Sequence, residues 1–297
     1  MSRFAGALGR TFYDLTVQSS AHSNSCGYGA LKTARSHASL DARCASIAGE
    51  AHDLRILVLS PHVGDACFSM SLTLSAWDSE GHRVTILNCF TRSRYAPYAD
   101  VEGVHENDRT SYVRAFRKKE DDVFRRGFRH LDVVDLNLRD AAIRLQCGAD
   151  EVCSHRLDEA DPMLQRIRTA AAMQMAAGGA QCVVMPLGIG GDIDHLLVRE
   201  AGILLAAEAA IVCYEDLPYA ARGDAGEAIE STVASVAARA GQSLSPVLMA
   251  VPGGATKKMA QVVTYPSQIN DDEAALIADY ANRYGGGERI WVSERWR

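Results

Sequence analysis

The sequence predicts an α/β fold of the Rossmann-like kind, a mostly parallel sheet with helices on both faces. From residue 54 onward, short apolar runs alternate with helix-length segments. The first run, RILVLS at 55–60, is almost continuously apolar, which is typical of strands buried on both faces. Hydrophobic residues make up 47% of the chain and charged residues 23%, an ordinary globular composition.

Each element follows from the same alternation, because Gly, Pro or polar residues mark the breaks between apolar runs. The predicted strands are 55–60, 83–90, 131–136, 181–185 and 210–214. The predicted helices are 66–80, 112–127, 161–177 and 195–208. Toward the C-terminus the chain adds the segment 246–251, helices at 257–268 and 271–284, and a last strand at 289–293. Strands that alternate with helices indicate βαβ units and a parallel sheet.

The chain has 297 residues, within the range of one large α/β domain. Residues 1–52 are rich in Ser, Ala, Gly and His and show little periodicity, so we expect an irregular N-terminal extension. Residues 53–297 contain no linker or internal repeat, and we expect them to form a single α/β domain.

The charge and the composition exclude several classes of protein. The net charge is −6, so the chain lacks the basic footprint of a nucleic-acid binder. The uncharged run 169–191 contains Pro186 and several glycines, which argues against a membrane span. The eight cysteines contain no C-x-x-C, and we expect buried thiols in a reducing cytoplasm. The expected partner is a small-molecule substrate, and the sequence leaves open whether the chain forms a homo-oligomer.

Polar residues follow two of the predicted strands directly. His62 and Asp65 lie in the loop after 55–60, and Asp192, Asp194 and His195 follow the strand 181–185. Ligand sites of open parallel sheets lie beyond the carboxyl ends of the strands, so these side chains should meet at one rim.

Two imidazoles and a carboxylate form a ligand set for catalytic zinc, which keeps one position open for water or substrate. His62, Asp65 and His195 would supply such a set. The competing interpretation of His62-x-x-Asp65 is an ordinary loop with a helix-capping Asp. Such sites also accept Fe²⁺ or Mn²⁺, so the sequence leaves these metals open beside Zn²⁺.

From 54 to 268 the sequence resembles the PIG-L (LmbE-like) zinc-dependent de-N-acetylases. The resemblance rests on PHVGD at 61–65, GHRVTILNCFTRS at 81–93, R-x-x-E at Arg117 and Glu120, DLNLRD at 135–140, PLGIGGDIDH at 186–195, YEDLPY at 214–219 and SQ at 267–268. It implies a Rossmann-like fold, zinc held by His62, Asp65 and His195, and an N-acyl amino sugar or similar polar substrate. It also implies that Asp140 touches substrate hydroxyls.

Both family motifs are altered at their proton-transfer positions. The first motif, usually H-P-D-D-E, has Gly64 where the family carries its general base. The second, usually H-x-D-H, has Asp192 in place of its first His. Asp192 is the natural replacement base; otherwise it is a solvated loop residue or an added metal ligand. Asp194 would act beside it, by orienting a metal ligand.

Substrate contacts are expected from the loop 91–110 and its neighbours. The candidates are Arg92, Tyr95, Arg117 and Asp140, although plain loop roles remain the alternative for the loop residues. The charge run 114–129 is interpreted as the solvated face of a helix.

Together with the resemblance, these features predict a hydrolase that cleaves the C–N bond of an N-acyl group on a small polar, sugar-like or amino-acid-like substrate. We expect a deacetylase in which Asp192, or the substrate itself, takes the proton. Two alternatives stay open: a metal-dependent enzyme with a transfer, rearrangement or lyase step, and a pseudoenzyme that binds a ligand.

Overall fold

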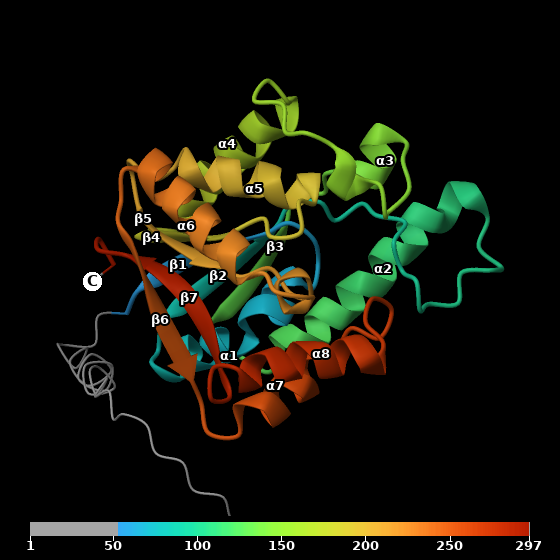
Figure 1. The fold of residues 1–297 in the computed structure, drawn as a ribbon. Helices are drawn as coiled ribbons and strands as arrows, with labels where there is room; N and C mark the ends of the chain where they lie inside the picture. Colours follow the sequence, from blue (N-terminus) through green and yellow to red (C-terminus); the bar gives the residue numbers. More distant parts are fainter. Residues whose placement is uncertain (1–52, 297) are drawn as a thin grey trace, which may run out of the picture. The chain divides into compact units, whose positions relative to one another are not determined.

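The computed structural model describes residues 53–296, so the expected extension 1–52 lies outside the described residues. Seven strands form one sheet in the order β3-β2-β1-β4-β5-β7-β6 (Figure 1). Their bounds are β1 (Arg55–Ser60), β2 (Arg83–Asn88), β3 (Leu131–Asp135), β4 (Cys182–Pro186), β5 (Ala210–Tyr214), β6 (Leu244–Ala250) and β7 (Gly287–Ser293). Strands β1 to β5 are parallel, whereas β7 runs antiparallel to β5 and β6. The predicted α/β class is confirmed.

Helices cover both faces of the sheet. They are α1 (Asp65–Ser79), α2 (Glu106–Arg125), α3 (Ala141–Leu145), α4 (Pro162–Gly178), α5 (Ile193–Ile203), α6 (Gly226–Ala240), α7 (Gly254–Val262) and α8 (Asp271–Asn282). On one face α4 and α5 pack against each other and on β1 and β4, with α6 next to α5. On the other face α1 packs against α7, which pairs with α8, and α2 lies beside this group (Figure 1).

The core lies around the central strands. Every residue of β4 and β5 is buried, and so is every residue of β1 after Arg55. This burial explains the continuous apolar runs, since a central strand with a helix layer on each face has no solvent-facing side. Among the described residues, Cys67, Cys89, Cys182 and Cys213 are buried and unpaired, as expected. Cys147 is only partly buried and Cys153 is exposed, so the expectation of buried thiols is wrong for these two.

Several helix boundaries differ from the prediction. Helix α2 starts at Glu106 instead of 112, because the His105 ring accepts the Asn107 N–H and acidic residues occupy the first turn. Helix α7 ends at Val262 instead of 268, shortly before Pro266, which cannot donate a helical hydrogen bond. Helix α6 was not predicted.

Among residues 53–296, no helix is both long enough and apolar enough to pass through a bilayer.

Candidate metal centre

The loop after β1 brings two predicted ligands together. Asp65 is the first residue of α1, and its Oδ2 accepts the backbone N–H of His62 at 2.8 Å. The Ser60 hydroxyl donates to the His62 carbonyl at 2.6 Å and accepts the Ala66 N–H at 3.3 Å. These bonds stabilise the turn that places His62 and Asp65 on the same side of the loop.

The loop after β4 supplies the second half of the site. Asp192 is the N-cap of α5, and its Oδ1 accepts the Asp194 N–H at 2.9 Å. His195 follows in the first turn of the helix and is almost completely buried. Because β1 and β4 are neighbours in the sheet, the two loops meet at its carboxyl edge.

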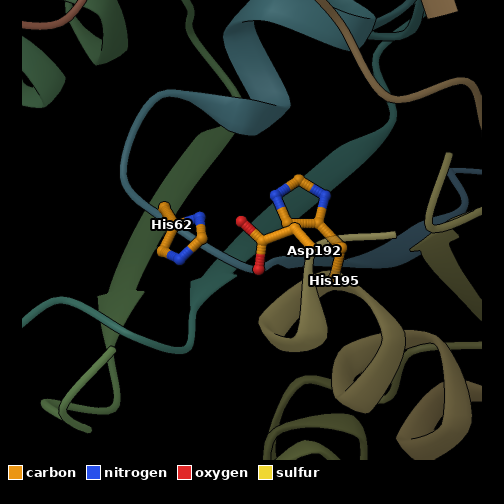
Figure 2. Close-up of side chains that lie close together, drawn as sticks. All are labelled: His62, Asp192 and His195. Carbon is orange, nitrogen blue, oxygen red and sulfur yellow. The ribbon is translucent and has the colours of Figure 1, made fainter. Parts of the chain in front are cut away.

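The structure places the three predicted ligands in contact. Asp65 Oδ2 lies 3.2 Å from Nδ1 of His62 and 3.2 Å from Nε2 of His195. Asp192 joins them: His62, Asp192 and His195 each offer a ligand atom, and these atoms all lie within 4.8 Å of one another. In Figure 2 the Asp192 carboxylate lies between the two imidazole rings.

Each imidazole is also held by a further carboxylate. His195 donates from Nδ1 to Asp216 at 2.7 Å, and Asp216 accepts the Ile189 N–H at 2.9 Å through its other oxygen. Nε2 of His62 lies 3.2 Å from Asp194, which also accepts the Ala141 N–H at 2.7 Å and pairs with Arg144.

Asp216 is part of the motif YEDLPY, in which sequence reasoning gives it no role, and Arg144 is not singled out from the sequence. The position of Asp216, two residues beyond β5 on the same sheet edge, is the signal that identifies it. Carboxylates that hold metal-binding imidazoles fix the ring orientation and the tautomer.

The electrostatics of the site favour cations. Burial lowers the pKa of His62, but hydrogen bonds to Asp194 and Asp65 outweigh it and raise the pKa to about 10. Burial likewise opposes the charged form of His195, yet Asp65 and Asp216 raise its pKa well above the usual value. The pKa of Asp65 is held far below its ordinary range: burial opposes the charged form, but the charges and hydrogen bonds of both imidazoles prevail. Buried carboxylates around two nitrogen donors form a donor set that fits a divalent metal.

The surroundings of Gly64 are filled by neighbouring side chains. Its φ is +105°, a conformation that residues with a Cβ rarely adopt. A Cβ there would lie 3.0 Å from two ring atoms of Phe68 and 3.3 Å from the Gln268 amide nitrogen.

Two predicted substrate contacts lie inside the protein. Arg117 is buried, and its guanidinium donates to the Val63 carbonyl at 2.9 Å and bonds the Gln268 side chain, so it supports the loop that carries His62. Burial lowers the pKa of Arg117. Asp140 is the N-cap of α3 and accepts the Ile143 N–H at 3.0 Å.

The other two predicted substrate contacts are more accessible. Arg92 is partly buried and bonds Asn137 at 3.0 Å, and Tyr95 is exposed. Tyr219 ends the motif YEDLPY, but sequence reasoning assigns no role to this residue. Its hydroxyl lies 3.5 Å from Asp192, and its ring packs edge-on against His195 at a centroid distance of 5.7 Å.

Comparison with known proteins shows which family this chain belongs to. No protein-family model matches the chain. It is 30% identical over 246 residues to the 2'-N-acetylparomamine deacetylase of Streptomyces fradiae, covering 80% of this chain and 81% of that protein.

Two solved structures are similar in fold. The zinc-inhibited form of teicoplanin deacetylase Orf2 has a TM-score of 0.58 at 20% identity, with 81% of this chain and 98% of that one covered. The A40926 pseudoaglycone deacetylase Dbv21 has a TM-score of 0.56 at 22% identity, covering 83% and 99%. The identity and coverage of the Streptomyces relative, together with the α/β fold, place this chain in the PIG-L (LmbE-like) family of deacetylases.

Proposed function

We propose that this protein is a zinc-dependent deacetylase that hydrolyses an N-acetyl group on a small, polar, sugar-like substrate. The observation that carries the proposal is the cluster of His62, Asp65, Asp192 and His195 at the carboxyl edge of the sheet. The similarity to a 2'-N-acetylparomamine deacetylase supports the substrate class. Fe²⁺ or Mn²⁺ would suit the same donors.

In this proposal His62, Asp65 and His195 hold the metal. When bound with an open position, such a metal polarises an amide carbonyl and lowers the pKa of water. Asp216 and Asp194 keep the two imidazoles in the orientation that ligation needs, since each bonds the ring nitrogen opposite the one facing Asp65.

Asp192 is assigned the proton transfer. Its Oδ1 is occupied by the Asp194 N–H, whereas Oδ2 contacts the Tyr219 hydroxyl at 3.5 Å. That second oxygen is available to take a proton from the attacking water and to deliver it to the departing nitrogen. Tyr219 can donate to Asp192 and keep the carboxylate turned toward the imidazoles.

The test combines metal content with acetate release from 2'-N-acetylparomamine and from simpler N-acetyl amino sugars. We expect about one equivalent of zinc, lost in His62→Ala and His195→Ala. Asp192→Asn should retain the metal and lose about 10²–10⁴-fold in kcat, the usual contribution of general acid–base catalysis.

The outcomes separate the alternatives. Loss of metal in Asp192→Asn would make Asp192 a ligand and not the base. A protein that binds zinc but releases no acetate from any of these substrates would contradict the hydrolytic assignment. A chain that takes up no metal after reconstitution would overturn the proposal as a whole.

A further inference from the structure

A cavity of about 720 Å³ lies at the carboxyl ends of β2 and β3, against α2. One wall is a single face of α2, because Asn107, Ser111, Arg114 and Lys118 recur at spacings of four, three and four residues. None of the candidate metal ligands lines it. Its volume falls within the roughly 300–1,000 Å³ of small-molecule sites.

The lining of this cavity is strongly cationic. Its charged side chains are Arg92, Arg94, Arg114, Lys118 and Arg139, opposed by Asp135. The whole chain has a net charge of −6, so this cationic cluster has the opposite sign to the net charge of the protein. A cavity lined by one sign of charge concentrates ligands of the opposite sign.

Internal acids neutralise only part of this charge. Arg94 pairs with Glu106 at 2.6 Å, and Lys118 lies 3.7 Å from Asp135. Within residues 53–296, Arg114 and Arg139 form no ion pair. Arg114 is exposed and Lys118 partly exposed, as the interpretation of 114–129 as a solvated helix face expects, and both side chains line this cavity.

The backbone holds two of the arginines side by side. Arg92 and Arg139 are paired in a parallel bridge, and Arg92 exchanges backbone hydrogen bonds with Leu138 at 2.9 Å and with Asp140 at 3.0 Å. The Arg92 side chain is further fixed by its bond to Asn137. Arg92 and Arg139 therefore extend from hydrogen-bonded backbone segments on one wall of the cavity. Arg114 lies on the wall formed by α2.

We propose that this cavity binds the phosphoryl group of a small molecule. Guanidinium groups present paired N–H donors that match phosphate oxygens, and several of them suit a group with more than one negative charge. Asn107, Thr110 and Ser111, from the first turns of α2, add neutral donors. The proposal does not depend on the metal chemistry, because it uses different side chains.

Isothermal titration at constant ionic strength tests the site with four probes: inorganic phosphate, pyrophosphate, glucose 6-phosphate and adenosine 5′-diphosphate. We expect binding of at least one probe, with Kd raised about 10-fold or more in Arg114→Ala and in Arg139→Ala. Lys119→Ala is the matched control, since Lys119 is exposed on α2 and does not line the cavity.

The probe that binds tightest identifies the source of the phosphoryl group: free phosphate, a sugar phosphate or a nucleotide. Circular dichroism checks that the variants, all at exposed positions, keep the fold. Absence of binding by all four probes at millimolar concentration would overturn the proposal. An equal loss of affinity in Lys119→Ala would overturn it too, by showing that only general charge attraction is at work.

Discussion

His195 and Asp216 are joined by a hydrogen bond of 2.7 Å between Nδ1 of the ring and a carboxylate oxygen. The two residues follow β4 and β5, which are parallel neighbours in the sheet, so the strand order brings them together. Asp216 is completely buried, and its other oxygen accepts the Ile189 N–H. This pair leaves Nε2 of His195 facing Asp65 and the centre of the candidate metal site.

Asp216→Asn should lower zinc affinity about 10- to 100-fold, as loss of such an orienting carboxylate does in metal sites. The amide cannot provide the same anionic acceptor for the imidazole N–H. Competition with a chelator measures the affinity, and Asp279→Asn, an exposed change on α8, is the control. Equal affinities in the two variants would show that Asp216 does not support the metal.

Gly64→Ala should lower the free energy of unfolding by more than Gly81→Ala does. Both glycines have positive φ, +105° and +86°, a conformation that costs other residues about 1–2 kcal/mol. Only at Gly64 does a Cβ also meet a side chain, Phe68 at 3.0 Å, whereas the space around Gly81 is open. Urea unfolding measures both losses. Equal losses would mean that Phe68 moves aside without cost.

Gly190 and Tyr219 should be energetically coupled. A Cβ at 190 would lie 2.5 Å from two atoms of the Tyr219 ring, so Gly190→Ala must displace the ring. Its cost in unfolding free energy should fall by about 0.5–3 kcal/mol when Tyr219 is already Ala. The double-mutant cycle, measured by urea unfolding, cancels the strain from the +95° φ of Gly190, which both backgrounds share. Additive losses would contradict the coupling.

Glu200 should contribute stability that is lost in acid. Burial alone would raise its pKa, but hydrogen bonds and charges of Arg239 and Arg199 outweigh it and lower the pKa below the ordinary 4.5. A carboxyl whose folded pKa lies below its unfolded pKa stabilises the protein above the unfolded value. That contribution then disappears as the pH falls through the folded pKa.

Glu200→Gln should therefore reduce the free energy of unfolding at about pH 7, and the difference from the parent should narrow as the pH falls below about 4.5. Urea unfolding across this range measures the effect. The exposed Glu208, changed to Gln, is the control and should leave the profile unaltered. A difference that widens on acidification would contradict the lowered pKa.

Much of the scaffold follows from local sequence. The apolar runs at β1, β4 and β5 are long enough and continuous enough to specify buried parallel strands, because burial on both faces removes the need for polar alternation. The same reasoning places the two polar loops at one sheet edge, and the predicted contact of His62, Asp65 and His195 is present. The start of α2 was missed because a His cap at 105 is a weaker signal than Ser, Thr, Asp or Asn.

By itself, then, the sequence determined the alternating strands and helices and the positions of the loops that carry polar groups. Only the tertiary structure decided which acid bonds which imidazole, Asp216 with His195 and Asp194 with His62, and that Phe68 fills the space at Gly64. It also decided that Arg92, Arg114 and Arg139 share one cavity. The physical reason is that periodicity records how each residue meets solvent, whereas these contacts depend on strand order and on packing between segments far apart in the chain.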